Sequence, residues 1–336
     1  MTRAEGAMTD ASSTLLYLSG EDVAAVTPPM SAVVDAVEEA FRLRGLGRTE
    51  MPAKPSLHFG SSAFSQTMAA YVGGVEALGV KWICLVPENR DRGLPLAHAV
   101  MVLSDTATGR PLALMEAGLI TALRTGASVA VAARHLARAD SGALGFLGCG
   151  VQARAALEAL ATVLPTPARV RCYDVQPAAM AEFTGAAFAL AADLQIETCD
   201  RPADVVAGAA VVVSAITMGE AAPPLGAGLL EPGALAVALD YDAAWTSAAI
   251  AECDLFVCDD VPQLLATRAA GPRLAGIPEQ VHGDLAELAA GVKPGRRRDD
   301  ERIFCMNLGV AIEDVVTAKL VYEHAVAAGV GRLLPL

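Results

Sequence analysis

Three charged side chains stand in stretches of the sequence that are otherwise apolar. Lys81 lies in GVKWICLV, Arg124 in LITALRTGASVAVAA, and Asp240 at the end of ALAVALD. A buried charge is costly unless a partner or a ligand compensates it. Two cations facing a cavity could hold an anion, and a guanidinium binds a carboxylate or phosphate through two parallel hydrogen bonds. Lys54, in MPAKPSLHF, is a fourth and weaker candidate.

Each of these charges also has a purely structural interpretation. Lys81 lies in a predicted strand with apolar neighbours on both faces, so its ammonium could extend to a surface instead of a cavity. Arg124 lies in a predicted helix with little polar surface and could pair with an internal Asp or Glu. Asp240 could cap a helix in the segment that follows it. The sequence alone leaves both interpretations open for each residue.

A glycine-rich turn is a candidate site for a dinucleotide. Gly148, Gly150 and Ala153 have the spacing G-x-G-x-x-A, between an apolar run at 143–147 and an Ala- and Leu-rich stretch at 151–164. The glycines permit a sharp turn and the close approach of a pyrophosphate, which the free N–H groups of the helix start would face. We therefore predict a strand, a turn and a helix that bind a dinucleotide. The alternatives are another doubly wound domain, such as a methyltransferase, or a turn without a ligand.

An acidic residue ends the next predicted strand, at 169–173. Asp174 can accept hydrogen bonds from a ribose 2′-hydroxyl, and its charge would repel a 2′-phosphate. The sequence therefore favours NAD over NADP. Arg171 precedes Asp174, but strand alternation places it on the same face as Tyr173, so its reach toward a phosphate stays open.

Asp240 ends another predicted strand of this domain. Ligands of open α/β sheets bind outside the carboxyl ends of the strands, which places Asp240 near the nicotinamide, where a carboxylate can exchange protons. Lys81 and Arg124 would then hold a substrate carboxylate, while the nicotinamide exchanges hydride with the adjacent carbon. That is the chemistry of an α-amino or α-imino acid.

The elements that position these residues follow from sequence periodicity. Ser19 and Asp22 resemble a capping box before a short helix that ends near Pro28, and Ser31 is expected to cap a longer helix. This second helix should end at about Arg44. Successive strands are then predicted at 51–59, 63–72, 79–86, 97–103 and 110–116.

The second half of the chain shows the alternation of strands and helices that is typical of a doubly wound parallel sheet. A long Ala-rich helix at 116–138 leads into it, and a final amphipathic helix at 308–328 is expected to pack back on the first domain, making that domain discontinuous. Residues 88–95 are expected to form a loop and 105–109 a tight turn. Strands are predicted near 143–147, 169–173, 194–198, 209–214, 234–239 and 254–258.

The composition limits the function classes. The chain has 336 residues, 54% of them hydrophobic, and a formal net charge of −13, which argues against a nucleic acid or an anionic membrane as partner. The cysteines are scattered without a C-x-x-C pair, so no structural metal is expected and core packing in a reducing compartment is favoured. Residues 1–13 look frayed and lack a signal peptide, and the apolar run at 205–218 is too short to span a bilayer, so we expect a soluble, cytoplasmic protein.

Together these motifs resemble the ornithine cyclodeaminase/mu-crystallin family. The resemblance covers nearly the whole chain and is carried by MPAK, GVKW, PENRDRGLP, DTATGRP, LITALRTGA, GCGVQAR, ALD and LGVAIED, in this order. Members of the family combine an NAD(P)-binding Rossmann domain with a substrate domain that builds a dimer. The resemblance implies an α/β fold with the Rossmann domain at 126–304, and a discontinuous α+β substrate and dimerisation domain at 1–125 and 305–336.

The resemblance also implies roles for individual residues. Lys81 and Arg124 match the ligands of the substrate carboxylate, and Lys54 stands where the family often has Arg. Asp240 matches the catalytic proton donor and acceptor, a role that Lys81 could share. The implied cofactor is NAD, with NADP as the alternative, and no metal. The implied cofactor contacts are Arg124, Thr125, Gly148, Gly150, Val151, Gln152, Asp174, Ser214 and Asp240.

The sequence departs from the cyclodeaminases in the strand that precedes Lys81. Cyclodeaminases carry a Glu just before M-P, which is thought to activate water or accept a proton. Here the segment reads SQTMA, and Gln66 cannot take that role. Leu96 and Met306 replace polar residues of relatives, and Asn307 stands where Ser is common. These departures favour imine reduction or amino-acid oxidation over ornithine deamination.

The sequence thus predicts a homodimeric NAD(P)-dependent oxidoreductase acting at the α-carbon of an amino acid or its imine, with a small amino, imino or keto acid as substrate. One alternative is an ornithine cyclodeaminase, which makes proline and ammonia without a net change in NADH. Another is a nucleotide-bound binding protein without turnover. The presence of Lys81, Arg124 and Asp240 favours catalysis.

Overall fold

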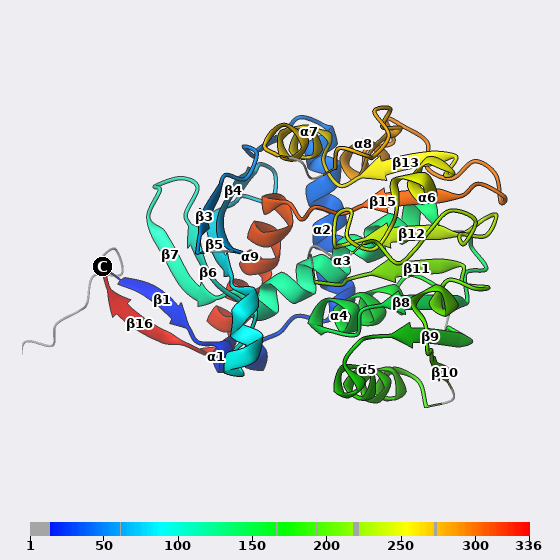
Figure 1. Cartoon of the computed structure of the whole chain (residues 1–336). Helices are drawn as coiled ribbons and strands as arrows, with labels where there is room; N and C mark the ends of the chain where they lie inside the picture. Colours follow the sequence, from blue (N-terminus) through cyan, green and yellow to red (C-terminus); the bar gives the residue numbers. More distant parts are fainter. Residues whose placement is uncertain (1–13, 61, 166, 193, 218–221, 272–273) are drawn as a thin grey trace, which may run out of the picture.

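The computed structural model of the chain describes residues 14–60, 62–165, 167–192, 194–217, 222–271 and 274–336. Two sheets form its framework, one at the left and one at the right of Figure 1, with three long helices between them. The segment 1–13, which we expect to be frayed, lies outside the described residues. No helix in the described part of the chain is long and apolar enough to cross a membrane.

The first sheet has the strand order β16-β1-β7-β6-β5-β4-β2, with β3 paired to β4. Its neighbouring strands are antiparallel except β1 and β7, which are parallel. The sequence predicts the five strands β3 to β7, although β3 is shorter than the predicted run at 51–59, and it does not predict β1, β2 or β16. The bounds are β1 (Thr14–Leu18), β2 (Thr49–Glu50), β3 (Ser56–Phe59), β4 (Ala63–Val72), β5 (Ala77–Leu85), β6 (Ala97–Ser104), β7 (Pro111–Glu116) and β16 (Arg332–Pro335).

The second sheet is parallel throughout, in the order β10-β9-β8-β11-β12-β15-β13-β14. The order of strands reverses direction between β8 and β11, which is where ligands bind in doubly wound folds. All six predicted strands of this sheet are confirmed. The bounds are β8 (Ala143–Leu147), β9 (Arg169–Tyr173), β10 (Gln195–Thr198), β11 (Val211–Ser214), β12 (Leu235–Ala238), β13 (Leu255–Cys258), β14 (Gly283–Asp284) and β15 (Ile303–Met306).

Strand β15 belongs to the second sheet. It inserts between β12 and β13, and all four of its residues are buried. The boundary expected between residues 304 and 305 falls inside this strand, so the second sheet extends to Met306. A strand buried on both faces shows no alternation of apolar and polar residues, which is why IFCM gives no clear signal.

The helices agree with the predictions except in detail. The capping box is confirmed, because the backbone N–H of Asp22 donates to the Ser19 hydroxyl and the Ser19 N–H donates to the Asp22 carboxylate. Ser31 is not a cap, since α2 already starts at Met30 after Pro29. The bounds are α1 (Gly20–Ala25), α2 (Met30–Gly45), α3 (Gly118–Leu136), α4 (Val151–Leu160), α5 (Pro177–Leu190), α6 (Ser247–Ala251), α7 (Val261–Ala269), α8 (Leu285–Ala289) and α9 (Ala311–Ala328).

The described residues also include two short 3-10 helices, η2 (Pro87–Arg92) and η3 (Pro202–Val205). The first corrects the expectation of an irregular loop at 88–95. The tight turn at 105–109 is confirmed, because the Gly109 N–H donates to the carbonyl oxygen of Asp105 at 2.8 Å.

Helices α2, α3 and α9 lie between the two sheets (Figure 1), and α9 packs on β4 and β5. The amphipathic pattern expected for α9 is confined to its second half, since residues 311–318 are all buried. Helix α3 is almost wholly buried and packs closely on α4. A Cβ at Gly126 of α3 would lie 2.4 Å from the carbonyl oxygen of Ala155, so only glycine permits this approach. The packing of α9 on β4 and β5 joins the chain's C-terminal part to the first sheet, as expected.

Candidate functional site

A cleft of about 2000 Å³ is lined by residues of both sheets. Strands β3 to β6 contribute one wall, and the segments at the carboxyl ends of β8, β9, β11 and β12 contribute the other. Pockets for a single small molecule are about 300–1,000 Å³. The cleft is therefore large enough for a dinucleotide together with a small substrate.

The glycine turn forms the nucleotide wall of the cleft. Gly148 has φ of +90°, and a Cβ there would lie 2.5 Å from the carbonyl oxygen of Ala215. Gly150 is the N-cap of α4 without a side-chain cap, and no atom lies within 4 Å of where its Cβ would be. Val151 and Gln152 line the cleft beside it, and the buried Gln152 Oε1 has no hydrogen-bond partner. This open, uncapped helix start fits a pyrophosphate.

Asp174 lines the same wall at the end of β9. Its Oδ2 accepts a hydrogen bond from the N–H of Cys149 at 2.8 Å, and its Oδ1 accepts one from the N–H of Gln176 at 2.9 Å. Two backbone donors thus hold the carboxylate in one orientation. Its position fits the predicted contact with a ribose hydroxyl.

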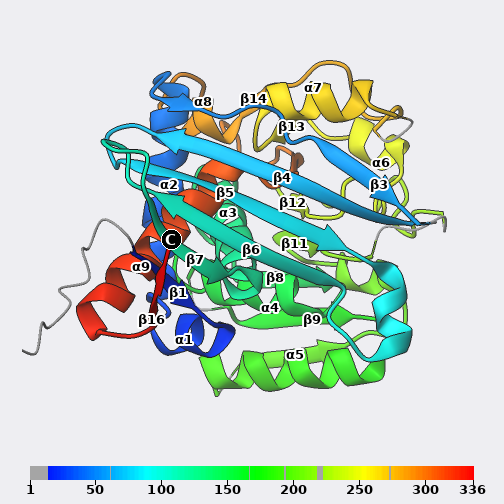
Figure 2. The same ribbon diagram turned by 90° about the vertical axis from the view of Figure 1, so that its left-hand side faces the viewer.

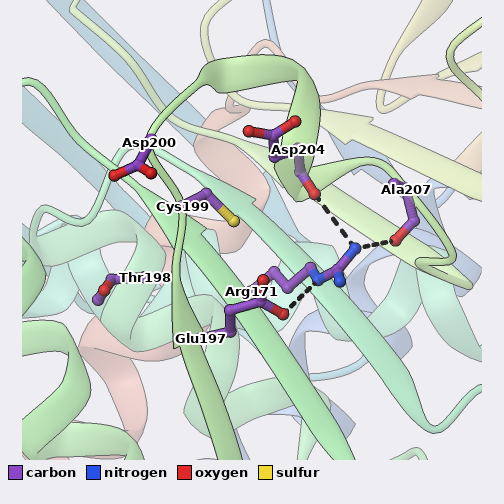
Figure 3. Close-up of a pocket in the computed structure, with 7 residues that line it drawn as sticks. All are labelled: Arg171, Glu197, Thr198, Cys199, Asp200, Asp204 and Ala207. Atoms are coloured by element: carbon purple, nitrogen blue, oxygen red, sulfur yellow. Dashed lines mark hydrogen bonds and ion pairs between the residues drawn. The ribbon is translucent and has the colours of Figure 1, made fainter.

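Arg171 lies in a separate small pocket of about 270 Å³, shown in Figure 3. Its Nε pairs with Glu197 at 2.7 Å, and its Nη1 donates to the carbonyl oxygens of Ala207 at 2.7 Å and Asp204 at 3.5 Å. The guanidinium is therefore held by acceptors of β10 and of the segment around η3, and none of the three acceptor residues lines the cleft. These contacts answer the question of its reach that the sequence leaves open.

Asp240 lines the cleft just beyond β12 and is only 2% exposed. Its carboxylate accepts hydrogen bonds from the Ser214 hydroxyl at 2.9 Å and from the Ile216 N–H at 3.0 Å. Burial raises the pKa of Asp240 to about 6, although these two donors oppose the shift. It is not a helix cap, because Thr246 caps the next helix, α6. A carboxyl with a pKa near neutrality can exchange protons in either direction.

Lys81 is fully buried, and its Nζ lies 2.6 Å from Oδ1 of Asp314. The alternative that its ammonium reaches a surface is therefore wrong. Burial lowers the pKa of Lys81 to about 8, and the nearby charge of Arg124 acts in the same direction. Lys81 is not among the residues that line the cleft.

Arg124 pairs with two acids at the start of α9. Its Nη1 lies 2.6 Å from Glu313 Oε2, and its Nε lies 3.0 Å from Asp314 Oδ1. The alternative of an ion pair with internal acids is thus what the structure shows. Arg124 is 7% exposed and lies behind the cleft wall, where a Cβ on Gly309 would approach its Nη1 to 2.6 Å.

Lys54 is the predicted substrate cation that lines the cleft itself. Its Nζ donates to the carbonyl oxygens of Leu308 at 2.5 Å and Gly309 at 2.9 Å, and lies 5.8 Å from the ring centroid of Tyr241. Within the described part of the chain, Lys54 forms no ion pair with a carboxylate. The weakest sequence candidate is therefore the most accessible of the three cations.

The chain is similar to known proteins over nearly its whole length. The family model of the ornithine cyclodeaminase/mu-crystallin family matches residues 17–329. The chain belongs to this family. Alanine dehydrogenase of Archaeoglobus fulgidus is 36% identical over 94% of this chain and 97% of its own length. A Delta(1)-pyrroline-2-carboxylate reductase of Bacillus cereus is 32% identical over 90% of this chain and 94% of its own length.

Solved structures of related proteins also match nearly the whole chain. Delta(1)-pyrroline-2-carboxylate reductase of Thermococcus litoralis, in complex with NADH and L-proline, has a TM-score of 0.84 and 32% identity, covering 95% of this chain and 99% of that one. An archaeal alanine dehydrogenase dimer with bound NAD has a TM-score of 0.81 and 32% identity, covering 96% and 99%. The family fold therefore extends over nearly the whole chain, with a second domain beside the doubly wound one.

The structure divides the family's predicted site residues into two groups. The residues that line the cleft are Lys54, Gly148, Gly150, Val151, Gln152, Asp174 and Asp240. The residues buried behind its wall are Lys81, Arg124, Thr125 and Ser214. Of the departures from relatives, Leu96 and Gln66 line the cleft, whereas Met306 and Asn307 are buried, with Asn307 donating to the Ser128 hydroxyl at 2.9 Å.

Sequence reasoning missed three acids of this site. Glu313 and Asp314 are fully buried partners of the cations, and adjacent acids at the start of an apolar helix are the signal that could have found them. Asp259 is also fully buried, and its Oδ2 accepts from the Gly309 N–H at 2.6 Å. Burial raises the pKa of Asp259, with the charge of Glu313 acting in the same direction. Asp259 thereby holds the turn whose carbonyl oxygens bind Lys54.

Proposed function

We propose that this family member is an NAD-dependent oxidoreductase that transfers hydride at the α-carbon of an amino acid or its imine. The observation that carries the proposal is the buried carboxyl of Asp240, which lines one cleft together with the uncapped glycine turn and Lys54. The named relatives and solved structures, an alanine dehydrogenase and a pyrroline-2-carboxylate reductase among them, support it.

The nucleotide wall has the donors that NAD needs. The N–H groups at the start of α4 and the open space at Gly150 suit the pyrophosphate, and Asp174 suits the ribose. The nicotinamide supplies the group that accepts or donates hydride. What remains for the protein is to bind and orient the substrate and to move the proton.

Asp240 moves the proton in this proposal. In oxidation, the substrate's amino group gives a proton to the Asp240 carboxylate while the α-carbon loses hydride, leaving the imine. In reduction, the protonated carboxyl gives its proton to the imine nitrogen as hydride arrives at the carbon. The hydrogen bonds from Ser214 and Ile216 hold the carboxyl at the cleft wall for both directions.

The substrate carboxylate is bound where Lys54 lines the cleft, which we call the cationic end. Of the three predicted substrate cations, Lys54 is the one that lines the cleft, and it has no carboxylate partner among the described residues, so a substrate carboxylate can reach it directly. Lys81 and Arg124 lie deeper, and a substrate that reaches them shares them with Glu313 and Asp314. The buried acids keep these cations charged and oriented when no substrate is bound.

A screen of keto acids with amines tests this function. The purified protein is incubated with each pair and NADH or NADPH, and the absorbance of the reduced cofactor is followed. We expect consumption of NADH that is lost in Asp240→Asn. Conversion of ornithine to proline without a net change in NADH would replace the proposal by a cyclodeaminase, and cofactor binding without any turnover would replace it by a binding protein.

We also propose that the chain forms a homodimer through the outer face of the first sheet. Figure 2 looks onto this face, and no described helix covers it. Trp82 and Val100 are directly paired on β5 and β6 and are 40% and 44% exposed, which leaves adjacent apolar surface on the face. Light scattering should give the mass of a dimer, and a Val100→Lys variant should reduce it toward that of the 34.5 kDa chain.

A further inference from the structure

The face of β5 that carries Lys81 continues into the cleft. Alternation along the strand places Lys81, Ile83 and Leu85 on one face. The antiparallel register sets Gln66 beside Ile83 and Phe64 beside Leu85. Residues that are paired across neighbouring strands form rows on this face. Helix α9 packs on β4 and β5 and covers the row that contains Lys81. The next two rows, which contain Ile83 and Leu85, line the cleft. The surface next to the substrate cations is therefore set by these two rows.

We call this surface the cleft floor. The row at Gln66 and Ile83 is completed by Ser56 and Ala99, and the row at Phe64 and Leu85 is completed by His58 and Ala97. The cleft floor consists of Ser56, His58, Phe64, Gln66, Ile83, Leu85, Ala97 and Ala99, all of which line the cleft. None of the eight is a carboxylate, a lysine or an arginine, and the amide of Gln66 already donates to the hydroxyl of Ser56 at 3.1 Å.

The charged residues of the cleft lie elsewhere. Among the described lining residues, the carboxylates are Asp174 and Glu182 at the nucleotide wall, Asp240 beyond β12, and Glu116, which accepts from the Gly118 N–H at 2.7 Å at the start of α3. Besides Lys54, two arginines line the cleft, Arg90 of η2 and Arg154 of α4. Arg90 donates to the Thr217 hydroxyl, and Arg154 pairs with Glu182. The floor thus offers no carboxylate to a cationic substrate side chain and no lysine or arginine to an anionic one.

On the basis of the proposed function, we propose that the substrate is an α-amino or α-imino acid with a neutral, apolar side chain lying over the cleft floor. Its carboxylate is at the cationic end, and its α-carbon is at Asp240. An ammonium or second carboxylate over Ile83 and Phe64 would lose water without gaining a carboxylate, a lysine or an arginine as its partner, which is costly. Each buried methylene instead improves binding by about fourfold.

The first experiment compares substrates with the wild-type holoenzyme. We measure kcat/KM for oxidation of alanine, 2-aminobutyrate, valine, leucine and proline, and of ornithine, lysine, aspartate and glutamate. We expect the best neutral amino acid to exceed every charged one by at least about tenfold, since a charge left unpaired opposes binding. A charged amino acid as best substrate would overturn the inference while leaving the proposed function intact.

A binding measurement separates the two proposals. If neither the amino acids nor the pairs of keto acid and amine are turned over, the proposed function fails, and calorimetry of 2-oxo acids with the NADH-saturated protein decides the inference. Pyruvate, 2-oxobutyrate or 4-methyl-2-oxopentanoate should bind more tightly than 2-oxoglutarate and oxaloacetate. Equal or reversed affinities, or no binding at all, would overturn it.

A charge placed on the floor provides a sharper test. Gln66→Glu should raise kcat/KM for ornithine and lysine, relative to the best neutral substrate, by at least about tenfold through a new ion pair. Gln66→Met is the matched control, because it has a similar length without the charge and should keep the neutral preference. A ratio that does not move in Gln66→Glu, with the fold intact by circular dichroism, or that moves equally in both variants, contradicts the assignment of the floor.

Discussion

The two walls of the cleft are built in different ways. The nucleotide wall consists mainly of backbone: a left-handed glycine, an uncapped helix start and a carboxylate held by two N–H groups. We call the wall formed by strands β3 to β6 the substrate wall. The buried charges beside it come from distant segments, since Lys81 and Asp314 are 233 positions apart in the chain. A backbone site needs a short run of suitable residues, whereas a side-chain site needs the whole fold to bring its charges together.

The largest expected effect is at Asp240, which lines the nucleotide wall just beyond β12. Asp240→Asn keeps the size and hydrogen bonding of the side chain and removes proton exchange, so kcat should fall by about 10²–10⁴. NADH affinity, measured by fluorescence titration, should stay nearly unchanged. Burial raises the pKa of Asp240 to about 6, so oxidation by the wild type should slow as the pH falls through 6 and the carboxylate becomes protonated. Near-normal turnover in Asp240→Asn would move the proton role to Lys81.

The second effect tests how much the substrate wall depends on its buried ion pairs. Asp314→Ala leaves Lys81 without its partner and should lower the free energy of unfolding by about 3–5 kcal/mol, measured by urea denaturation. Lys81→Met/Asp314→Leu should lose less, because no unpaired charge remains. Lys319→Ala, in the exposed pair with Glu323, is the control and should change stability by less than about 1 kcal/mol. If Asp314→Ala and Lys319→Ala lower the free energy of unfolding equally, the buried pair contributes no more to stability than the exposed one.

The third effect separates two glycines of the nucleotide wall. Gly150→Ala has room and an ordinary φ of −73°, so stability should not change, but the new Cβ faces the space assigned to the pyrophosphate. We expect NADH binding to weaken by roughly tenfold or more, because the backbone can no longer approach the phosphates. Gly148→Ala should instead destabilise the fold by about 1–3 kcal/mol, since its φ is +90° and a Cβ would meet Ala215. Unchanged NADH affinity in Gly150→Ala would place the cofactor elsewhere.

The smallest expected effect concerns the choice of cofactor. The charge of Asp174 should make NADH bind about tenfold more tightly than NADPH, because it opposes a 2′-phosphate. Asp174→Asn should narrow this ratio in fluorescence titrations. Arg171→Ala should leave it unchanged, because Arg171 is held by Glu197 and by backbone oxygens in the separate pocket. Tighter binding of NADPH by the wild type would contradict the assignment of Asp174.

Local sequence is sufficient to place the elements of the nucleotide wall. The strand at 143–147, the glycine turn, the helix start and Asp174 lie within about thirty consecutive residues and obey local rules of backbone conformation, so all are placed as expected. The capping box at Ser19 is local in the same way.

The remaining features of the site and of the second sheet depend on tertiary packing. This packing made the charges of Lys81 and Arg124 partners of Glu313 and Asp314, left Lys54 in the cleft, and inserted β15 into the middle of the second sheet. Each of these outcomes depends on contacts between segments far apart in the chain. No local pattern specifies which acid will meet a buried cation, because that choice follows from how the helices and sheets pack.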